Sequence, residues 1–173
     1  DRVIMADEAG EIVDGDELLF IMARHYAEQN RLRGGVIGTE MSNLGLELKL
    51  RERKIPFERT KVGDRHVLEA LKQNGWTLGG EASGHIVNLD LTTSGDGIVS
   101  ALQILSIVRS SGRSLQELKK EMVKFSILQR FSIMVKSFTS VQKPNFLVLA
   151  MSISTCLRVA MKMLKSSKLM ELE

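Results

Sequence analysis

Short apolar runs and longer amphipathic stretches alternate along residues 1–125. The short runs predict strands, and they lie at residues 2–6, 11–13, 36–37, 55–59, 76–78 and 86–89. The amphipathic stretches predict helices, and they lie at residues 17–29, 43–53, 66–74, 97–110 and 115–122. Because strands and helices alternate, we expect an α/β fold, a layered domain whose mainly parallel or mixed sheet is flanked by helices.

Capping residues mark the predicted helix ends. Asp14 or Asp16 can cap the first helix, and Ser42 or Asn43 can cap the second. Ser114 and its partner three positions later form a capping-box pattern for the last helix, and a glycine at position 75 is a natural stop. Leu44 and Leu48, together with the nearby leucines at 46 and 50, are the expected buried positions of the second helix.

The C-terminal part differs from the rest in composition. All 14 glycines lie at or before position 112. Residues 1–122 hold 16 Lys and Arg against 19 Asp and Glu, whereas residues 123–173 hold 8 against 2. The net charge of +3 therefore reflects the C-terminal part alone. We expect residues 126–173 to be an atypical basic extension, such as an amphipathic segment or a frame-shifted or truncated end.

Membrane and nucleic-acid partners are not predicted. The apolar run at residues 146–157 is shorter than the roughly 20 residues that a spanning helix needs. The basic residues of the C-terminal part are scattered singly, which does not favour a surface for nucleic acid or anionic lipid. The single cysteine, Cys156, excludes an internal disulfide, and Asp1 opens a polar stretch unlike a signal peptide. We expect a cytoplasmic location.

A polar loop at residues 80–85 is the main candidate site. It gathers a carboxylate, a hydroxyl and an imidazole, from Glu81, Ser83 and His85, between two strand-like runs. Gly80 and Gly84 allow backbone conformations that other residues avoid. Such a loop can exchange hydrogen bonds with several hydroxyls of one sugar. The alternative is a hairpin turn whose polar groups only face water.

A second candidate lies at residues 61–65. Lys61 and Arg65 flank a glycine at a predicted helix start, which favours an anion site. The alternative is a helix capped by Asp64 with a solvated basic edge. His25 and His66 have no partners at ligand spacing. The stretch 92–97 predicts a helix entry, since it lacks the lysine of a P-loop.

Five motifs occur in an order that resembles one enzyme family. They are VDGDELLFIMAR, GGVIGTEMSNLGLEL, KVGDRHVLEAL, GGEASGHI and TTSGDGI. Together they resemble the third domain of the phosphoglucosamine mutases, in the α-D-phosphohexomutase superfamily, and the likeness covers residues 1–125. Asp1 and Arg2 resemble the end of the family's metal-binding loop. The implied division is 1–14 for the end of the metal-loop domain, 15–125 for domain III and 126–173 for the unmatched extension.

The resemblance implies a function for each candidate residue. The family interconverts glucosamine 6-phosphate and glucosamine 1-phosphate through a phosphoserine supported by Mg²⁺ and a bisphosphorylated sugar. Glu81, Ser83 and Gly84 would bind the sugar. His85 would add a hydrogen bond or act as a general acid or base, with packing against the sheet edge as the alternative. Lys61 and Arg65 would contribute to substrate binding.

The resemblance assigns the first two residues to the metal and the phosphoserine. Asp1 would be the last of three metal-ligating aspartates, and Arg2 would help to neutralise the phosphoserine. A lone carboxylate holds Mg²⁺ poorly, so firm retention of the metal is not expected. We expect this chain by itself to be inactive, because the phosphoserine loop, two metal aspartates and the phosphate-binding domain have no counterpart in it.

Three alternatives remain open. The first is a phosphomannomutase- or phosphoglucomutase-type domain. The second is a non-catalytic module that binds hexosamine phosphate. The third is a chain that associates with itself through surface that neighbouring domains cover in the family.

Overall fold

The structure is a computed structural model that describes residues 1–122. The predicted extension at 126–173 lies outside the described residues, as do the last three residues of the predicted domain III. Within the described part, no helix has the length and apolar character needed to cross a bilayer.

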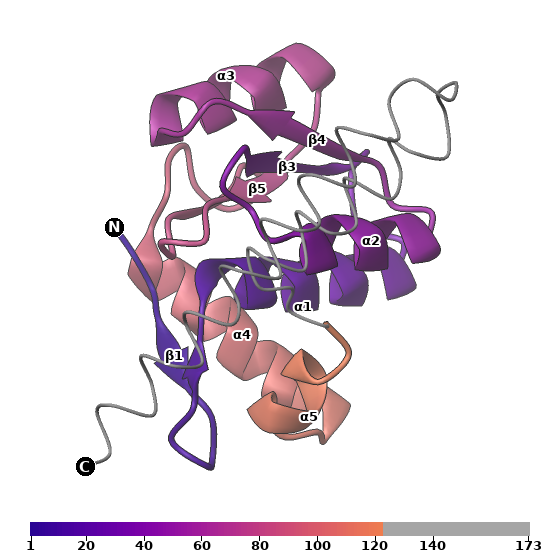
Figure 1. The fold of residues 1–173 in the computed structure, drawn as a ribbon, viewed down its shortest axis with the longest axis vertical. Helices are drawn as coiled ribbons and strands as arrows, with labels where there is room; N and C mark the ends of the chain where they lie inside the picture. The colour runs from indigo at the N-terminus through magenta and orange to yellow at the C-terminus, as the bar shows by residue number, and fades with distance from the viewer. Residues whose placement is uncertain (123–173) are drawn as a thin grey trace, which may run out of the picture. The chain divides into compact units, whose positions relative to one another are not determined.

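A four-stranded mixed sheet lies between α3 (Asp64–Asn74) on one side and α1 (Gly15–Glu28) and α2 (Leu44–Glu52) on the other (Figure 1). Its strands, in spatial order, are β4 (Phe57–Thr60), β3 (Val36–Thr39), β5 (Leu78–Gly80) and β6 (Ile86–Asn88). Strand β3 pairs in parallel with β4 and β5, and β6 runs antiparallel to β5. A separate antiparallel pair joins β1 (Met5–Ala6) to β2 (Ile12–Val13). The predicted α/β class with a mixed sheet is confirmed.

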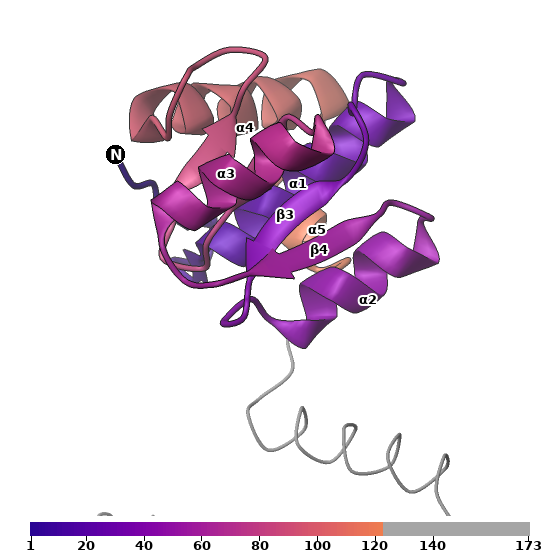
Figure 2. The same ribbon diagram turned by 90° about the horizontal axis from the view of Figure 1, so that it is seen from above.

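Helices cover both faces of this sheet. They are α1 (Gly15–Glu28), α2 (Leu44–Glu52), α3 (Asp64–Asn74), α4 (Gly97–Ser111) and α5 (Leu115–Lys119). Neighbouring residues of a strand face opposite sides, so Val36 packs in the core of α1, α2 and α4, whereas Ile37 packs under α3. Ile86 and Val87 divide in the same way. In Figure 2, seen from above, α3 lies over β3 with α1 beyond it.

Helix α1 is the central element of the core, and more of its surface is buried than an amphipathic stretch predicts. Its residues from Leu18 to Ala23 are all fully buried, not only those on one side. The reason is that α1 packs against β5 on one side and against α2, α4 and α5 on the others. In α2, Leu46 and Leu50 are fully buried, whereas Leu44 and Leu48 are only partly covered.

The predicted caps are largely confirmed. Asp14, not Asp16, caps α1 in a reciprocal capping box, and Asn43 caps α2. Gly75 ends α3 in the left-handed conformation, with φ of 66°. The alternative in which Asp64 caps α3 is wrong, because Gly63 occupies the N-cap and Asp64 is already helical. The capping box of the last helix forms as expected.

Two strands begin later than predicted because the first residues of each run close the preceding helix. The amide of Ile55 donates to the Leu50 carbonyl at 2.9 Å, and the amide of Trp76 donates to the Leu71 carbonyl at 2.9 Å. These residues therefore end α2 and α3, and the strand pairing starts two residues further along, at Phe57 and at residue 78. The predicted strand at 2–6 pairs only at its last two residues.

Candidate functional site

The polar loop is a tight turn between β5 and β6. The amide of Glu81 donates to the His85 carbonyl at 3.0 Å, and the amide of Gly84 donates to the Glu81 carbonyl at 3.0 Å. Gly84 has φ of 92°, a conformation that residues with a Cβ rarely adopt. The turn therefore presents Glu81, Ser83 and His85 within five residues at one end of the sheet.

Three separate segments hold this turn in place. The amide of Val3 donates to the Gly84 carbonyl at 3.0 Å, and the amide of Gly15 donates to the Ala82 carbonyl at 3.1 Å. The third contact comes from the Gly63 amide. Gly15 must lack a side chain, because a Cβ there would collide with the Glu81 carbonyl oxygen. The shape of the turn thus depends on the N-terminal segment, the start of α1 and the start of α3.

Both oxygens of the Glu81 carboxylate have protein partners. Oε1 accepts from the Gly63 amide at 2.8 Å, and Oε2 accepts from the Ser83 hydroxyl at 3.3 Å. Glu81 is only 9% exposed, whereas Ser83 is exposed. An ionised carboxylate offers about four lone-pair sites, so these two bonds leave capacity for hydroxyl donors. The arrangement fixes the carboxylate and still allows it to accept hydrogen bonds from a ligand.

His85 is buried beside the first residue of the chain. Its Nδ1 lies 3.6 Å from a carboxylate oxygen of Asp1, and its residue exposure is 6%. Its Nε2 is buried without a hydrogen-bond partner in the part of the chain that the structure describes. A Cβ on Gly95 would collide with the imidazole, so the backbone at Gly95 packs directly on the ring. The packing alternative and a polar role are both compatible with this position.

The stretch that precedes α4 packs on the N-terminal segment, a contact that the sequence did not predict. Asp96 caps α4 as expected of a helix entry, accepting from the amides of Ile98 and Val99. In addition, Gly97 packs on the Arg2 backbone so closely that a Cβ would collide with its carbonyl oxygen. The signal that could have shown this packing is the presence of two glycines, at 95 and 97, immediately beside a helix start.

The first two residues of the chain line a broad hollow of about 610 Å³ at the start of α4. Its remaining lining residues are Gly95, Asp96, Gly97, Ile98, Ala101 and Leu102. Because Asp1 also contacts His85, the structure brings Asp1, Arg2 and His85 to the same region.

The two predicted cations behave differently. Lys61 is exposed and lies two residues from Gly63, which contacts Glu81. The side chain of Arg65 is 84% exposed and pairs with Glu69 at 2.9 Å along its own helix. That pairing raises the pKa of the Arg65 guanidinium and lowers the pKa of the Glu69 carboxyl. The ion pair directs Arg65 along the surface of α3 rather than to the turn.

A Mg²⁺ site is not formed by the described residues alone. Within residues 1–122, no group of three His, Cys, Asp or Glu side chains could hold a metal ion. The Asp1 side chain is 68% exposed, and its carboxylate lies 3.6 Å from the Nδ1 atom of His85. One exposed carboxylate does not match the several oxygen ligands that Mg²⁺ needs.

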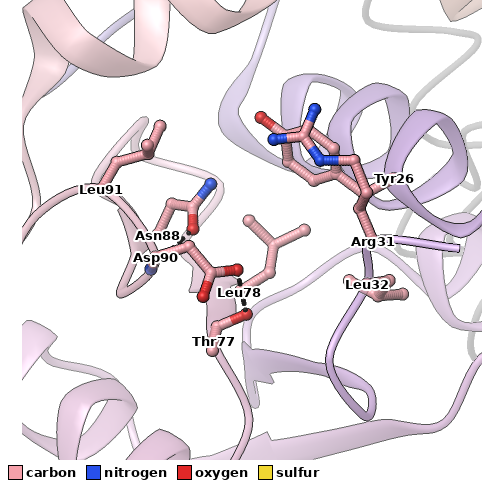
Figure 3. A pocket seen from close by; sticks show the side chains of 8 residues that line it. All are labelled: Tyr26, Arg31, Leu32, Thr77, Leu78, Asn88, Asp90 and Leu91. Atoms are coloured by element: carbon pink, nitrogen blue, oxygen red, sulfur yellow. Dashed lines mark hydrogen bonds between the residues drawn. The ribbon is translucent and has the colours of Figure 1, made fainter. Parts of the chain in front are cut away.

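A separate small pocket lies at the opposite end of the β5–β6 pair (Figure 3). It is lined by Tyr26, Arg31, Leu32, Thr77, Leu78, Asn88, Asp90 and Leu91. Its volume is about 30 Å³, room for a water molecule rather than a sugar. The Thr77 hydroxyl donates to Asp90 at 3.1 Å, and Asn88 binds Gln103 at 2.7 Å, so its polar groups are used internally.

Comparison with known proteins shows the same likeness as the sequence motifs. Residues 14–125 match the family model of phosphoglucomutase/phosphomannomutase, alpha/beta/alpha domain III. Phosphoglucosamine mutase from Thioalkalivibrio sulfidiphilus is 59% identical over 125 residues, covering 72% of this chain and 28% of that protein. The Hahella chejuensis enzyme of the same name is 59% identical over 124 residues, with the same coverage. The chain thus spans about 28% of the length of these relatives.

Solved structures share the fold at lower sequence identity. A phosphoglucomutase/phosphomannomutase family protein from Burkholderia thailandensis has a TM-score of 0.64 at 23% identity, covering 72% of this chain and 27% of that one. The Aspergillus fumigatus N-acetylphosphoglucosamine mutase, solved in complex with GlcNAc-6P and magnesium, has a TM-score of 0.56 at 19% identity, covering 70% and 33%. The match of the family model over residues 14–125 shows that this chain belongs to the phosphoglucomutase/phosphomannomutase family, of which it carries domain III.

Proposed function

We propose that this chain supplies the sugar-recognition turn of a phosphoglucosamine mutase. The observation that carries the proposal is the Glu81 carboxylate, which two hydrogen bonds hold on a turn beside the exposed Ser83 hydroxyl. The parent reaction interconverts glucosamine 6-phosphate and glucosamine 1-phosphate by phosphoryl transfer. The relatives that are 59% identical favour an amino-sugar phosphate over the glucose or mannose phosphates of sister enzymes.

The chemistry of phosphoryl transfer assigns limited tasks to this domain. Such transfer depends mainly on positioning the sugar and neutralising charge. Glu81 and Ser83 would exchange hydrogen bonds with ring hydroxyls, which fixes the orientation of the sugar. Lys61, exposed near the turn, and Arg2, in the hollow beside His85, would neutralise phosphate charge. In the parent enzyme, Asp1 would contribute one ligand to Mg²⁺, whose charge would help to neutralise phosphate.

Calorimetric titration of the 173-residue chain with glucosamine 6-phosphate tests this function. We expect binding that Glu81→Ala weakens at least about tenfold, since a hydrogen bond to a charged group is lost at each contacted hydroxyl. Glu52→Ala is the matched control: it removes the same charge from the exposed end of α2. Equal affinity of Glu81→Ala and wild type would contradict the assignment.

The same chain should not interconvert the two sugar phosphates by itself. The described residues form no three-ligand metal group, so charge neutralisation at a phosphoserine would be incomplete. The assay follows glucosamine 1-phosphate formation with Mg²⁺ and glucose 1,6-bisphosphate. Turnover above that of the Glu81→Ala variant would refute this expectation.

A second candidate function is self-association through α4. Ile98, Leu102 and Leu105 recur at helical spacing and are 75%, 61% and 52% exposed, so they form one apolar stripe on the helix. A second copy of the chain could cover this stripe with its own. Light scattering across a concentration series should then show dimers that Leu102→Lys dissociates. A monomer at every concentration would exclude this candidate.

A further inference from the structure

One hydrogen bond joins the sugar turn to the loop at residues 61–63. The Gly63 amide donates to Glu81 Oε1 at 2.8 Å, although the two residues are 18 positions apart. Bonds from an amide to a carboxylate are charge-assisted and stronger than neutral ones. The other protein bond to this carboxylate, from Ser83, is longer at 3.3 Å. Gly63 is therefore the main anchor of the Glu81 carboxylate.

Gly63 is held at both its amide and its carbonyl. Its carbonyl accepts from the amides of His66 at 3.0 Å and Val67 at 3.2 Å, which starts α3. Its backbone has φ of 127° and ψ of 134°, a region that glycine occupies readily and other residues do not. The amide of Gly63 is aimed at Glu81 because the helix start holds the same residue in this conformation.

Helix α3 supplies a second reason for the contact. It has no side chain of its own at the N-cap, where the other long helices α1 and α4 have an aspartate. The positive end of the helix dipole favours a negative charge there, and Glu81 brings one from the neighbouring turn. Asp64, in the first turn of α3, accepts from the Arg65 amide at 2.7 Å, so the charge of Glu81 adds to that of Asp64 at this helix start.

We propose that Gly63 is a positioning residue of the sugar site, whose amide orients the Glu81 carboxylate and couples the Lys61 loop to sugar binding. The inference rests on the proposed function, because it assigns Gly63 a role at the same sugar-recognition turn. Oε1 is held by Gly63 and Oε2 by Ser83, so their remaining lone pairs point in fixed directions. Lys61, two residues before Gly63, is carried by the same loop and is placed relative to the sugar by the same bond.

The substitution that tests this role is Gly63→Ala, and Gly75→Ala is its matched control. Both glycines have positive φ and lie at opposite ends of α3. A Cβ at Gly63 would meet only His66, at 3.5 Å, and a Cβ at Gly75 would meet nothing within 4 Å. Each variant therefore strains the backbone without a collision, but only Gly63→Ala displaces the amide bound to Glu81.

We expect Gly63→Ala to weaken glucosamine 6-phosphate binding by roughly tenfold, and Gly75→Ala to leave the affinity near that of wild type. Equal affinities of the two variants would overturn the positioning role. Absence of binding by wild-type chain would contradict the proposed function instead, and with it the sugar role of Gly63.

NMR separates a failure of the positioning role from a failure of the proposed function, because the measurement needs no sugar. NMR of wild-type chain should show scalar coupling across the bond from the Gly63 nitrogen to the Glu81 carboxyl carbon, and slow exchange of the Gly63 amide. Glu81→Gln, which keeps an acceptor oxygen, should retain the slow exchange, whereas Glu81→Ala should lose it. A Gly63 amide that exchanges equally fast in wild type and Glu81→Ala would overturn the inference whatever the sugar does.

Discussion

Asp16 should make the domain less stable as the pH rises through the weakly acidic range. This residue is 1% exposed at the start of α1. Its Oδ2 accepts from the Asn43 amide at 2.6 Å, but its Oδ1 is buried without a hydrogen-bond partner among the described residues. Burial raises the pKa of the Asp16 carboxyl from 3.8 to about 6, and the nearby Asp14 adds to the rise. The bond from Asn43, a bond from the Ser42 side chain and the charge of Arg59 oppose it.

The sign follows from comparing proton binding in the two states. The folded chain holds the Asp16 proton up to about pH 6, whereas the unfolded chain releases it near the ordinary value of 3.8. The stabilising contribution is therefore complete below about pH 4 and is lost as the pH rises to about 6. Each pH unit between these values corresponds to about 1.4 kcal/mol, so ionised Asp16 lowers the free energy of unfolding by roughly 3 kcal/mol at neutral pH.

Urea unfolding of wild type and Asp16→Asn across this pH range measures the effect. Asn keeps an acceptor for the Asn43 amide and removes the buried charge, so the variant should lack the fall in stability between about pH 4 and about pH 6. Asp64→Asn is the control, because Asp64 is an exposed aspartate at the start of another helix. If Asp16→Asn and wild type show the same pH slope, the Asp16 carboxyl does not titrate as its burial requires.

Two further substitutions test the packing of the site and of the domain end. Gly15→Ala should destabilise the fold by about 3 kcal/mol, because its Cβ would collide with the backbone of Glu81. Gly10→Ala, whose Cβ meets nothing within 4 Å, should cost about 1 kcal/mol. Similar losses of stability for the two variants in urea unfolding would contradict the collision. Glu121→Gln should lower the free energy of unfolding by about 2 kcal/mol at neutral pH, because it removes a carboxylate that pairs with three arginines. One of them, Arg24, is only 4% exposed. An unchanged thermal midpoint would refute that role of Glu121.

The elements of this fold could be predicted from local sequence, but their arrangement could not. Periodicity and caps located all five helices of the described part, because Asp14, Asn43 and Ser114 act on amides within three residues. The order β4-β3-β5-β6 depends on pairing between distant segments, which no local pattern encodes. The burial of α1 on every side was missed for the same reason, since it results from four elements packing around one helix.

The candidate site was likewise predictable where its residues are adjacent in sequence, but not where distant segments meet. The polar turn was found because its glycines and polar residues are adjacent in sequence, and the structure confirms a turn there. The partner of Glu81 was not predictable, because Gly63 is 18 residues away and acts through its backbone. The packing of Gly95 on His85 is likewise a contact of backbone with a distant ring. Their assigned functions stay predictions until binding is measured.

If the turn binds a sugar phosphate as proposed, the charges around it determine how that ligand lies. The buried Glu81 carboxylate repels a phosphate and accepts only from donors, so it can face ring hydroxyls but not the phosphate end. The exposed cation Lys61 lies on the loop that Gly63 ties to this carboxylate, and it attracts phosphate. A ligand bound in this way directs its hydroxyls to Glu81 and its phosphate away from that carboxylate. Neutral hexoses would then bind more weakly than their phosphates, and added salt would reduce that difference.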